Sequence, residues 1–472
     1  MNLSELVTSI GAVLSDYVLV SLLLVIAVYF TLRGRGLQFT MIGEMLRLLV
    51  RSGRRHTDAS SAHTHGSVSS FQAFALSIAS RVGTGNLAGV ATAITIGGPG
   101  AVFWMWVIAI LGAATSFVES TLGQLFKVKG EKSFIGGPAY YISKGLHKKW
   151  WAATFAVLIT LTFGFAFNSV QSNTIADALH LSFGLSRQIT GIVLALLTLI
   201  IVFGGVTRVS RFSEIVVPIM AVAYIILAMV IIVLNIHRFP DVLRMIFENA
   251  FGYGEVLGGT VGSAMIMGIK RGLFSNEAGE GSTPNAAATA TVSHPVKQGL
   301  IQAFGVYTDT LIVCSATAFI ILCSGVVPSD YDGGIILTQK AIDTSLGGSN
   351  YGSTFVCMAI FFFAFTSIIA NYYYGEANIR FLGAGSVSVG IYRLCVGAIV
   401  YIGALTSLDF VWGFADITMA LMTLCNLAAI ILLGKYAFAL LKDYKEQKRR
   451  GLDPVYHSST LPEIADDTEC WS

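Results

Sequence analysis

Long apolar segments are the feature of this sequence that most restricts how the chain can fold. An α-helix of about 20 apolar residues spans a bilayer core of roughly 30 Å, and such segments recur along the whole chain. Only 12% of the 472 residues are charged, which is too few to cover a soluble protein. The sequence therefore predicts an all-α polytopic membrane protein with about 11 transmembrane helices. The expected spans are 17–33, 70–97, 101–126, 151–178, 187–206, 213–236, 257–281, 297–325, 352–377, 387–407 and 409–441.

Charge and motif content argue against several other classes. The net charge of +3 is small and no basic stripe is interleaved with aromatic residues, so no nucleic acid is expected as a partner. The six cysteines lack zinc or redox spacing and are predicted to be buried thiols. The N-terminal segment lacks a basic region and a cleavage site, so 17–33 is predicted to be a retained helix. A solvated linker is favoured over a metal site at His56, His63 and His65.

The positions of basic residues indicate the orientation in the membrane. Lys and Arg gather between Arg33 and Arg55 and in the stretches KVKGEK, KGLHKKW, TRVSR and KDYKEQKRR. Because cytoplasmic loops carry the excess of Lys and Arg, we expect a multi-pass protein of the cell membrane with its N-terminus outside and its C-terminus cytoplasmic. Residues 237–256 are then an extracellular connector. The polar residues 442–472 are predicted to be a disordered cytoplasmic tail.

Two of the predicted spans are interrupted by residues that weaken helices. The stretch SIASRVGTGNLAGVATAITIGG (77–98) contains an arginine and a Gly-Thr-Gly-Asn run. The stretch IMGIKRGLFSNEAGEGSTPNAAATA (266–290) contains two cations, two carboxylates, four glycines and a proline. Each opens a set of five spans, 70–236 and 257–441, and matched interruptions of this kind indicate an inverted-repeat transporter. Residues 1–69, with one extra helix and a cytoplasmic linker, lie outside the two repeats.

An unwound segment at bilayer depth persists only where protein or ligand satisfies its backbone. The N–H groups that begin a half-helix suit a carboxylate, and the carbonyls that end one suit a small cation or an ammonium group. Two such segments side by side predict a site for an amino acid, which carries both groups. The alternative is that Gly83, Gly85 and Gly89 only allow helices to pack closely.

Four long motifs resemble those of one transporter family. They are SFQAFALSIASRVGTGNLAGVATAITIGGPGAVFWMW, GGPAYYI, KRGLFSNEAGEGSTPNAAA and YYYGEANIRFL. Across residues 17–440 the chain resembles the alanine or glycine:cation symporter family (sodium:alanine symporter type) of the amino acid–polyamine–cation superfamily. The resemblance implies a leucine-transporter-type fold of two inverted five-helix repeats after one extra helix. It also implies sodium-coupled uptake of a small neutral amino acid (alanine, glycine or glutamine), with a proton-coupled importer of the same fold as the alternative.

The resemblance implies where the substrate carboxylate binds. The backbone N–H groups of Thr84, Gly85 and Asn86 would hold it, and Gly83 and Gly85 would let the substrate approach the backbone closely. Asn86 could instead cap the half-helix.

The substrate amine is expected to face unwound carbonyls around Phe274, Ser275 and Asn276, with the Phe274 ring as a wall. Asn168 and Gln171 lie three residues apart on one helix face. Gln171 is the expected side-chain ligand, and a satisfied amide between packed helices is the alternative.

Sodium is the expected coupling ion. The resemblance implies ligation by the carbonyls of Ala79, Val82 and Phe363 and the hydroxyls of Thr366 and Ser367. Neutral oxygens suit sodium and avoid the cost of burying a carboxylate. The alternative is that the two hydroxyls only bond carbonyls of their own helix.

Arg81 raises a separate question because its side chain keeps its proton. A buried arginine is expected to meet a carboxylate, and Glu119, Glu277 and Glu280 are the candidates. A structural pair is favoured over a gating ion pair.

Asn371 stands where many family members have tryptophan. A smaller polar residue there would widen the pocket or make it more polar, so glutamine is as plausible a substrate as alanine. Glu376 and Asp309 are further intramembrane carboxylates without an assigned role. A proton path through one of them remains open.

Two rival classes fit the sequence less well. A channel needs a continuous polar pore, and no span has a sustained polar stripe. An enzyme needs a catalytic constellation, yet His180, His237 and His294 lie near span ends, away from both interruptions. The expected partners are therefore a small neutral amino acid, sodium and the lipid bilayer, and no catalysis is expected.

Overall fold

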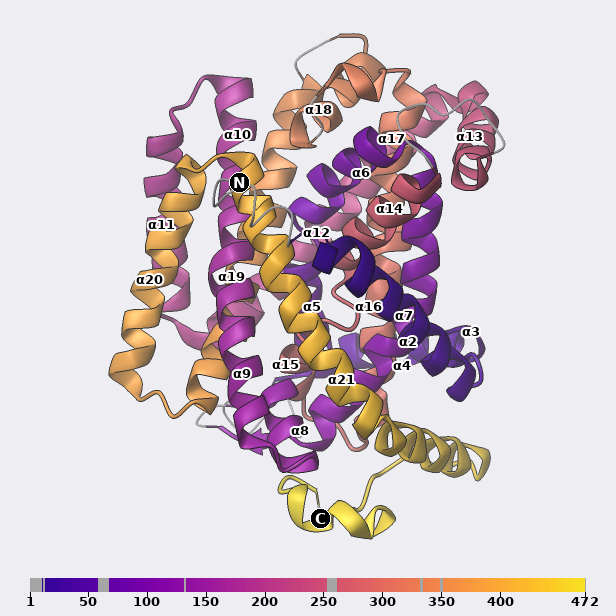
Figure 1. Ribbon diagram of the computed structural model, residues 1–472, viewed down its shortest axis with the longest axis vertical. Helices are drawn as coiled ribbons and strands as arrows, with labels where there is room; N and C mark the ends of the chain where they lie inside the picture. Colours follow the sequence, from indigo (N-terminus) through magenta and orange to yellow (C-terminus); the bar gives the residue numbers. More distant parts are fainter. Residues whose placement is uncertain are drawn as a thin grey trace.

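A computed structural model describes residues 11, 13–57, 68–130, 133–252, 261–331, 334–348 and 351–471. Most of these residues lie in helices, many of which run along the long axis of the molecule (Figure 1). Among them, eight helices are long and apolar enough to cross a membrane. The other predicted spans are the shorter helix α11 and the two interrupted segments, each built from short helices. The predicted polytopic helical class is confirmed.

The elements follow one another in the order that the hydropathy predicts. The first part contains η1 (Val13–Leu19), α2 (Val20–Arg33), α3 (Leu37–Thr40), α4 (Ile42–Thr57), α5 (Ser70–Arg81), η2 (Gly85–Gly89), α6 (Val90–Gly97), α7 (Gly100–Leu125), β1 (Val128–Lys129), β2 (Phe134–Ile135), α8 (Pro138–Gly145), α9 (Lys149–Ile159), η3 (Thr160–Phe167), α10 (Asn168–Phe183), α11 (Arg187–Val202), α12 (Gly205–Leu234), η4 (Ile236–Arg238) and α13 (Phe239–Phe251). The second part contains α14 (Val261–Asn276), α15 (Thr283–Ala288), α16 (Pro295–Val306), η5 (Tyr307–Cys314), α17 (Ser315–Ser324), η6 (Pro328–Asp330), α18 (Gly334–Ser345), α19 (Tyr351–Phe381), α20 (Ser386–Leu405), α21 (Leu408–Arg449), η7 (Ser458–Thr460) and η8 (Pro462–Asp467).

Helix α7 is the central packing element. It contacts α2, α14, α15 and α16, and most of its second half is buried. Small residues permit this crowding: a Cβ added at Gly123 would lie 2.8 Å from the Cβ of Pro284, at the start of α15. By contrast, α12 turns large apolar side chains such as Ile219 and Ile226 outward, where a membrane protein meets lipid. The interrupted segments therefore lie in the interior of the bundle.

The C-terminal tail differs from the sequence prediction. It was predicted to be disordered, but it folds against the end of the bundle that carries α8 (Figure 1). Trp471 Nε1 donates hydrogen bonds to the carbonyls of Gln124 (3.2 Å) and Leu125 (3.1 Å), and Lys144 pairs with Glu469. After Arg450 the tail contains acidic residues but no Lys or Arg, and it buries Tyr456, Leu461 and Ile464, which local composition does not reveal.

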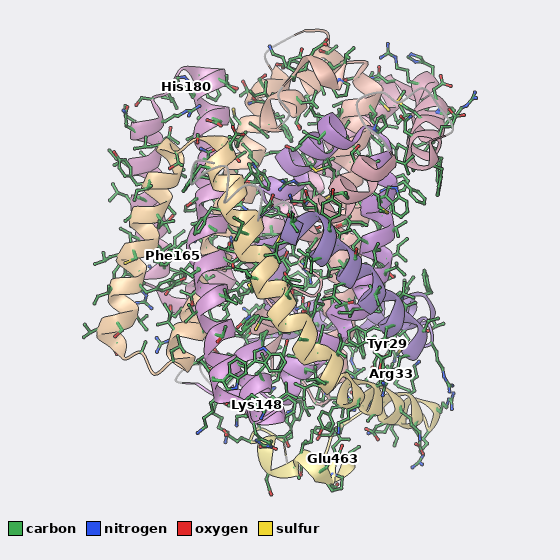
Figure 2. The ribbon with its side chains drawn as sticks, in the orientation of Figure 1. Tyr29, Arg33, Lys148, Phe165, His180 and Glu463 are labelled. Carbon is green, nitrogen blue, oxygen red and sulfur yellow. The ribbon has the colours of Figure 1, made fainter. Side chains whose placement is uncertain are left out.

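The two ends of the bundle carry different surfaces. Figure 2 shows Lys148 and Glu463 near the end that holds the C-terminus and His180 at the opposite end. The predicted linker is helical through Thr57 in α4, whereas His63 and His65 lie outside the described residues. The predicted connector contains α13, and its residues 253–256 also lie outside the described part.

Candidate functional site

The first interruption is a short break between α5 and η2. Helix α5 ends at Arg81, and Val82 adopts a non-helical conformation (φ −81°, ψ 89°). A Cβ added at Gly83 would lie 2.3 Å from Ser367 Oγ and 2.9 Å from Gln171 Oε1. Glycine is therefore required because side chains from α10 and α19 approach the bare backbone.

The N–H groups at this break are partly held by neutral amides. Gln171 Oε1 accepts from the backbone N–H of Thr84 (2.9 Å) and from its hydroxyl (2.6 Å). Asn86 Oδ1 accepts from the N–H of Gly83 (2.9 Å), which is the capping role left open by the sequence. The Gln171 oxygen thus occupies the Thr84 N–H, one of the groups that the sequence predicts for a substrate carboxylate.

Asn168 does not join this group. Its Nδ2 donates to the carbonyl of Gly164 in the preceding turn (3.1 Å), so it bonds within its own helix. Spacing of three residues placed Asn168 and Gln171 on one face, but only Gln171 reaches the break.

The second interruption is longer and begins later than predicted. Helix α14 continues through Phe274, Ser275 and Asn276, so these residues are the end of a half-helix and not unwound. The chain leaves the helix at Glu277, whose φ is 56°, and α15 begins at Thr283. The helix extends further because the glycines that take up left-handed conformations lie beyond Asn276. The last carbonyls of α14 nevertheless lack intrahelical N–H partners and still end a half-helix.

Phe274 occupies the interface of the two breaks. Its ring centroid lies 4.6 Å from that of Phe167 and 4.7 Å from that of Trp412. A Cβ at Gly85 would lie 3.1 Å from the Phe274 ring, so the two broken segments are in contact. Phe274 can therefore form an apolar wall beside the N–H groups of the first break, together with two rings that the sequence did not identify.

Asp309 joins the two breaks and was not given a role by the sequence. Its Oδ1 accepts from Asn86 Nδ2 (2.6 Å), beside the first break. Its Oδ2 accepts from the hydroxyls of Ser275 (2.8 Å), at the end of α14, and Thr310 (2.8 Å). An aspartate inside an apolar span is a sequence signal for a functional residue. The sequence does not show its partners, because they come from two distant segments.

The predicted sodium ligands converge on one hydroxyl. Ser367 Oγ lies 2.8 Å from the carbonyl oxygen of Ala79, 3.0 Å from that of Phe363 and 3.4 Å from that of Val82. Thr366 Oγ1 donates to the Phe363 carbonyl (2.8 Å). The five groups predicted from separate parts of the chain thus come together between α5 and α19.

The chemistry of this group fits a monovalent cation. All of its atoms are neutral carbonyl or hydroxyl oxygens, the kind of ligand that hard cations take. Within the described ranges, no set of three or more His, Cys, Asp or Glu side chains could hold a metal ion. The bonds from the two hydroxyls to Phe363 also show the alternative, since each hydroxyl bonds its own helix. Sodium binding here stays a prediction.

Arg81 was expected to pair with a carboxylate, but its hydrogen-bond partners are neutral oxygens. It is 1% exposed, and its guanidinium donates to the Gln302 carbonyl (3.1 Å), Ser116 Oγ (3.1 Å) and Thr283 Oγ1 (2.8 Å). Among the described residues it makes no ion pair within 4.0 Å. Neutral oxygens of α7, α15 and α16 surround it instead, and it ties α5 to the start of α15. The direct pairing prediction is therefore wrong.

Glu119 instead holds the second break. Its carboxylate accepts from the N–H groups of Gly279 (3.1 Å) and Gly281 (3.1 Å) and from Asn426 Nδ2 (3.0 Å). The two glycines have φ of 95° and 83°, which ordinary residues rarely adopt. A side chain of α7 thus satisfies the backbone that the missing helical turn leaves open.

The other two candidate carboxylates differ from each other. Glu277 lies 2.5 Å from both the Ser80 and the Ser282 hydroxyls. Ser80 Oγ also lies 2.7 Å from Asn371 Oδ1, so Asn371 joins the cluster that links the breaks. Both carboxylate oxygens of Glu280 are buried without a hydrogen-bond partner in the described structure.

The sequence matches the sodium:alanine symporter family over residues 1–458. It is 49% identical to the probable sodium/glutamine symporter GlnT of Bacillus subtilis, over 96% of this chain and 93% of that one. It is 48% identical to the amino-acid carrier protein AlsT of B. subtilis, over 97% and 96% of the two chains. The sodium/alanine symporter AgcS of Methanococcus maripaludis is 35% identical, over 95% and 99%.

Solved structures share the fold at low sequence identity. MhsT in complex with L-phenylalanine matches with a TM-score of 0.57 at 16% identity, over 86% of this chain and 94% of that one. The Eremococcus coleocola manganese transporter matches with a TM-score of 0.53 at 14% identity, over 84% of both chains. These likenesses confirm the predicted leucine-transporter-type fold.

Proposed function

Because this chain belongs to the sodium:alanine symporter family, we propose that it is a secondary active symporter coupling inward sodium movement to uptake of a small neutral amino acid. The observation that carries the proposal is the meeting of Ser367 with the carbonyls of Ala79 and Val82, directly before the first break. A cation at this junction would hold α5 and α19 together. Its occupancy would therefore control the shape of the backbone that receives the substrate.

The substrate is proposed to replace the protein's own groups at the first break. Its carboxylate would take the N–H of Thr84 from Gln171 and would also meet those of Gly85 and Asn86. Its amine would face the carbonyl end of α14, where the Asp309 carboxylate adds negative charge. Sodium release on the other side would loosen the junction and free the amino acid by alternating access.

One sodium ion supplies enough free energy for this task. Moving one positive charge inward contributes about 2.3 kcal/mol per 100 mV, and a tenfold sodium gradient adds about 1.4 kcal/mol. Together, about 3.7 kcal/mol supports roughly 500-fold accumulation at one-to-one coupling.

Glutamine is included among the proposed substrates, with alanine and glycine. Asn371 is 1% exposed and its Nδ2 has no hydrogen-bond partner within the described chain, so it could recognise a side-chain carbonyl. The relatives GlnT and AgcS are named for glutamine and alanine, respectively. In the membrane, the end that carries the C-terminus is proposed to face the cytoplasm because Lys and Arg gather there.

Proton coupling is the second candidate. Glu280 is fully buried with both oxygens unpartnered, and a charged carboxylate in that setting is costly. A proton carried by Glu280 would remove this cost. Relatives in B. subtilis and Bacillus sp. are named as sodium/proton-dependent alanine carriers.

Counterflow in proteoliposomes separates the two candidates. Purified protein is loaded with unlabelled amino acid, and entry of labelled alanine, glycine or glutamine is followed with and without sodium at two pH values. We expect entry to require sodium at both pH values. Sodium-independent entry that rises at the lower pH would replace the proposal with proton coupling.

A further inference from the structure

A cavity of about 460 Å³ lies away from the site described above. Its walls come from the β1–β2 hairpin, α8, the junction of α11 with α12, the end of α19 and the first half of α20. The end of α19 and the first half of α20, which line the cavity, lie toward the end of the bundle that holds α8 and the C-terminus (Figure 1). None of the proposed substrate or sodium ligands lines it.

The lining carries an excess of positive charge. Among the described residues of the lining, Lys129, Arg380 and Arg393 face a single carboxylate, Glu376. Glu376 is shared, because Arg380 lies 2.9 Å and Arg393 3.3 Å from its oxygens. One carboxylate cannot neutralise three cations, so the cavity attracts an anion.

A buried hydroxyl in the same wall lacks a partner. Tyr373 is 5% exposed, it lines the cavity, and its Oη has no hydrogen-bond partner in the described residues. A buried hydroxyl without a partner costs free energy. An anion with several oxygen acceptors would satisfy Tyr373 and the cations together.

Apolar side chains flank the cavity on the outside of the bundle. Phe203, in its wall, is 52% exposed. On α20, Val387, Ile391 and Leu394 are 78%, 58% and 57% exposed beside Arg393. Exposed apolar residues on an outer transmembrane helix meet acyl chains. The basic cavity therefore lies beside lipid-facing residues, where headgroups meet the protein.

We propose that this cavity binds the phosphate headgroup of an anionic phospholipid in the adjacent leaflet, which is cytoplasmic in the orientation proposed above. Basic pockets between transmembrane helices on that side suit anionic headgroups. The phosphate would accept from Arg393, Lys129 and Tyr373, and the acyl chains would follow the exposed face of α20. The lipid would join α19, which carries Ser367, to α20 and the hairpin. This inference does not depend on which substrate is transported.

Thermal unfolding of the detergent-purified chain tests the proposal. Midpoints are measured against increasing phosphatidylglycerol, phosphatidylcholine or inorganic phosphate. We expect phosphatidylglycerol to raise the midpoint at concentrations where the other two have little effect. Equal stabilisation by phosphatidylcholine would overturn the proposal, and equal stabilisation by inorganic phosphate would overturn its assignment to a lipid.

Two variants locate the binding. Arg393→Gln should weaken the apparent affinity for phosphatidylglycerol about fivefold, the value expected for one cation near an anionic headgroup. Tyr373→Phe leaves every ion pair intact and should weaken it about twofold to tenfold, as expected for one hydrogen bond. The matched control is Arg244→Gln, an exposed arginine on α13. Unchanged affinity in Tyr373→Phe and in a folded Arg393→Gln would reject this location.

Discussion

The two broken helices are satisfied by different chemistry. At the first break, neutral groups hold the backbone: the amide oxygens of Gln171 and Asn86 accept its N–H groups, and the Ser367 hydroxyl meets its carbonyls. At the second break, the Glu119 carboxylate holds two N–H groups of a longer loop with left-handed residues. Three donors meet on the single Glu119 side chain, whereas Gln171 and Asn86 each accept one backbone N–H of the first break. The first break is therefore suited to exchanging partners, and the second to fixing the site.

The largest expected effect on stability comes from a substitution at the second break. Glu119→Gln replaces one acceptor oxygen with an NH2 group that must face a donor. We expect a loss of about 2–4 kcal/mol in the free energy of unfolding, because buried donors lose their partner. Thermal unfolding in detergent measures this loss, and Glu463→Gln, at an exposed side chain of the tail, is the control. A change below about 0.5 kcal/mol would show that Glu119 does not fix the loop.

A substitution at Asp309, where the two breaks meet, should destabilise the protein less than Glu119→Gln but should reduce uptake strongly. Asp309→Asn removes one acceptor oxygen while keeping the shape of the side chain. We expect roughly a tenfold to hundredfold loss in kcat/KM for uptake, from about 1.5–3 kcal/mol of lost interaction. Asp177→Asn is the control, because the Asp177 carboxylate pairs with Arg187 (2.7 Å) and not with a residue of either break. Similar uptake by both variants would mean that Asp309 does not couple the breaks.

A substitution at the first break should reduce substrate affinity strongly while changing the free energy of unfolding only slightly. Gln171→Ala removes the side-chain amide that is predicted to contact the substrate once the substrate has displaced it from the Thr84 N–H. We expect KM to rise roughly tenfold, while the free energy of unfolding changes by about 1 kcal/mol. Asn168→Ala is the matched control, because Asn168 is buried in the same helix and bonds only its own turn. If Gln171→Ala destabilised the protein as much as Glu119→Gln, the contrast between the breaks would fail.

The smallest effect on stability at neutral pH is expected for His294, which lies after the second break, between α15 and α16. His294 caps α16, and burial lowers its pKa to about 4 despite the nearby Asp443 carboxylate. Its neutral form therefore contributes stability that is present above about pH 6.5 and is lost as the pH falls toward 4. His294→Gln should flatten the fall in unfolding midpoint over this range. An equally steep fall in the variant would assign the pH dependence to other groups.

Local sequence signals predicted the spans and the existence of both breaks. The length of each apolar segment predicts a span, and Gly83 and Gly279 mark the places where helices are interrupted. The family resemblance predicted that Ser367 lies near its carbonyl partners. The spacing of these residues along the sequence does not predict this contact.

Features set by long-range packing were harder to predict. A buried arginine must be compensated, but the sequence does not show that Arg81 meets three neutral oxygens. Likewise, the carboxylates of Glu119 and Asp309 were visible, whereas their partners come from other helices. Local composition predicts a disordered tail, whereas Trp471 holds the tail by hydrogen bonds to carbonyls at the end of α7, far away in the chain.

The sodium dependence of transport by Ser367→Ala tests the central claim most directly. The matched control is Ser169→Ala, a serine on α10 that bonds only the Phe165 carbonyl of its own helix (2.9 Å). Counterflow at increasing sodium concentrations gives an apparent sodium affinity for each variant. We predict a loss of about tenfold or more for Ser367→Ala, from one lost ligand worth about 1.4 kcal/mol, and less than twofold for Ser169→Ala. Wild-type sodium affinity in Ser367→Ala would contradict a cation site beside the first break.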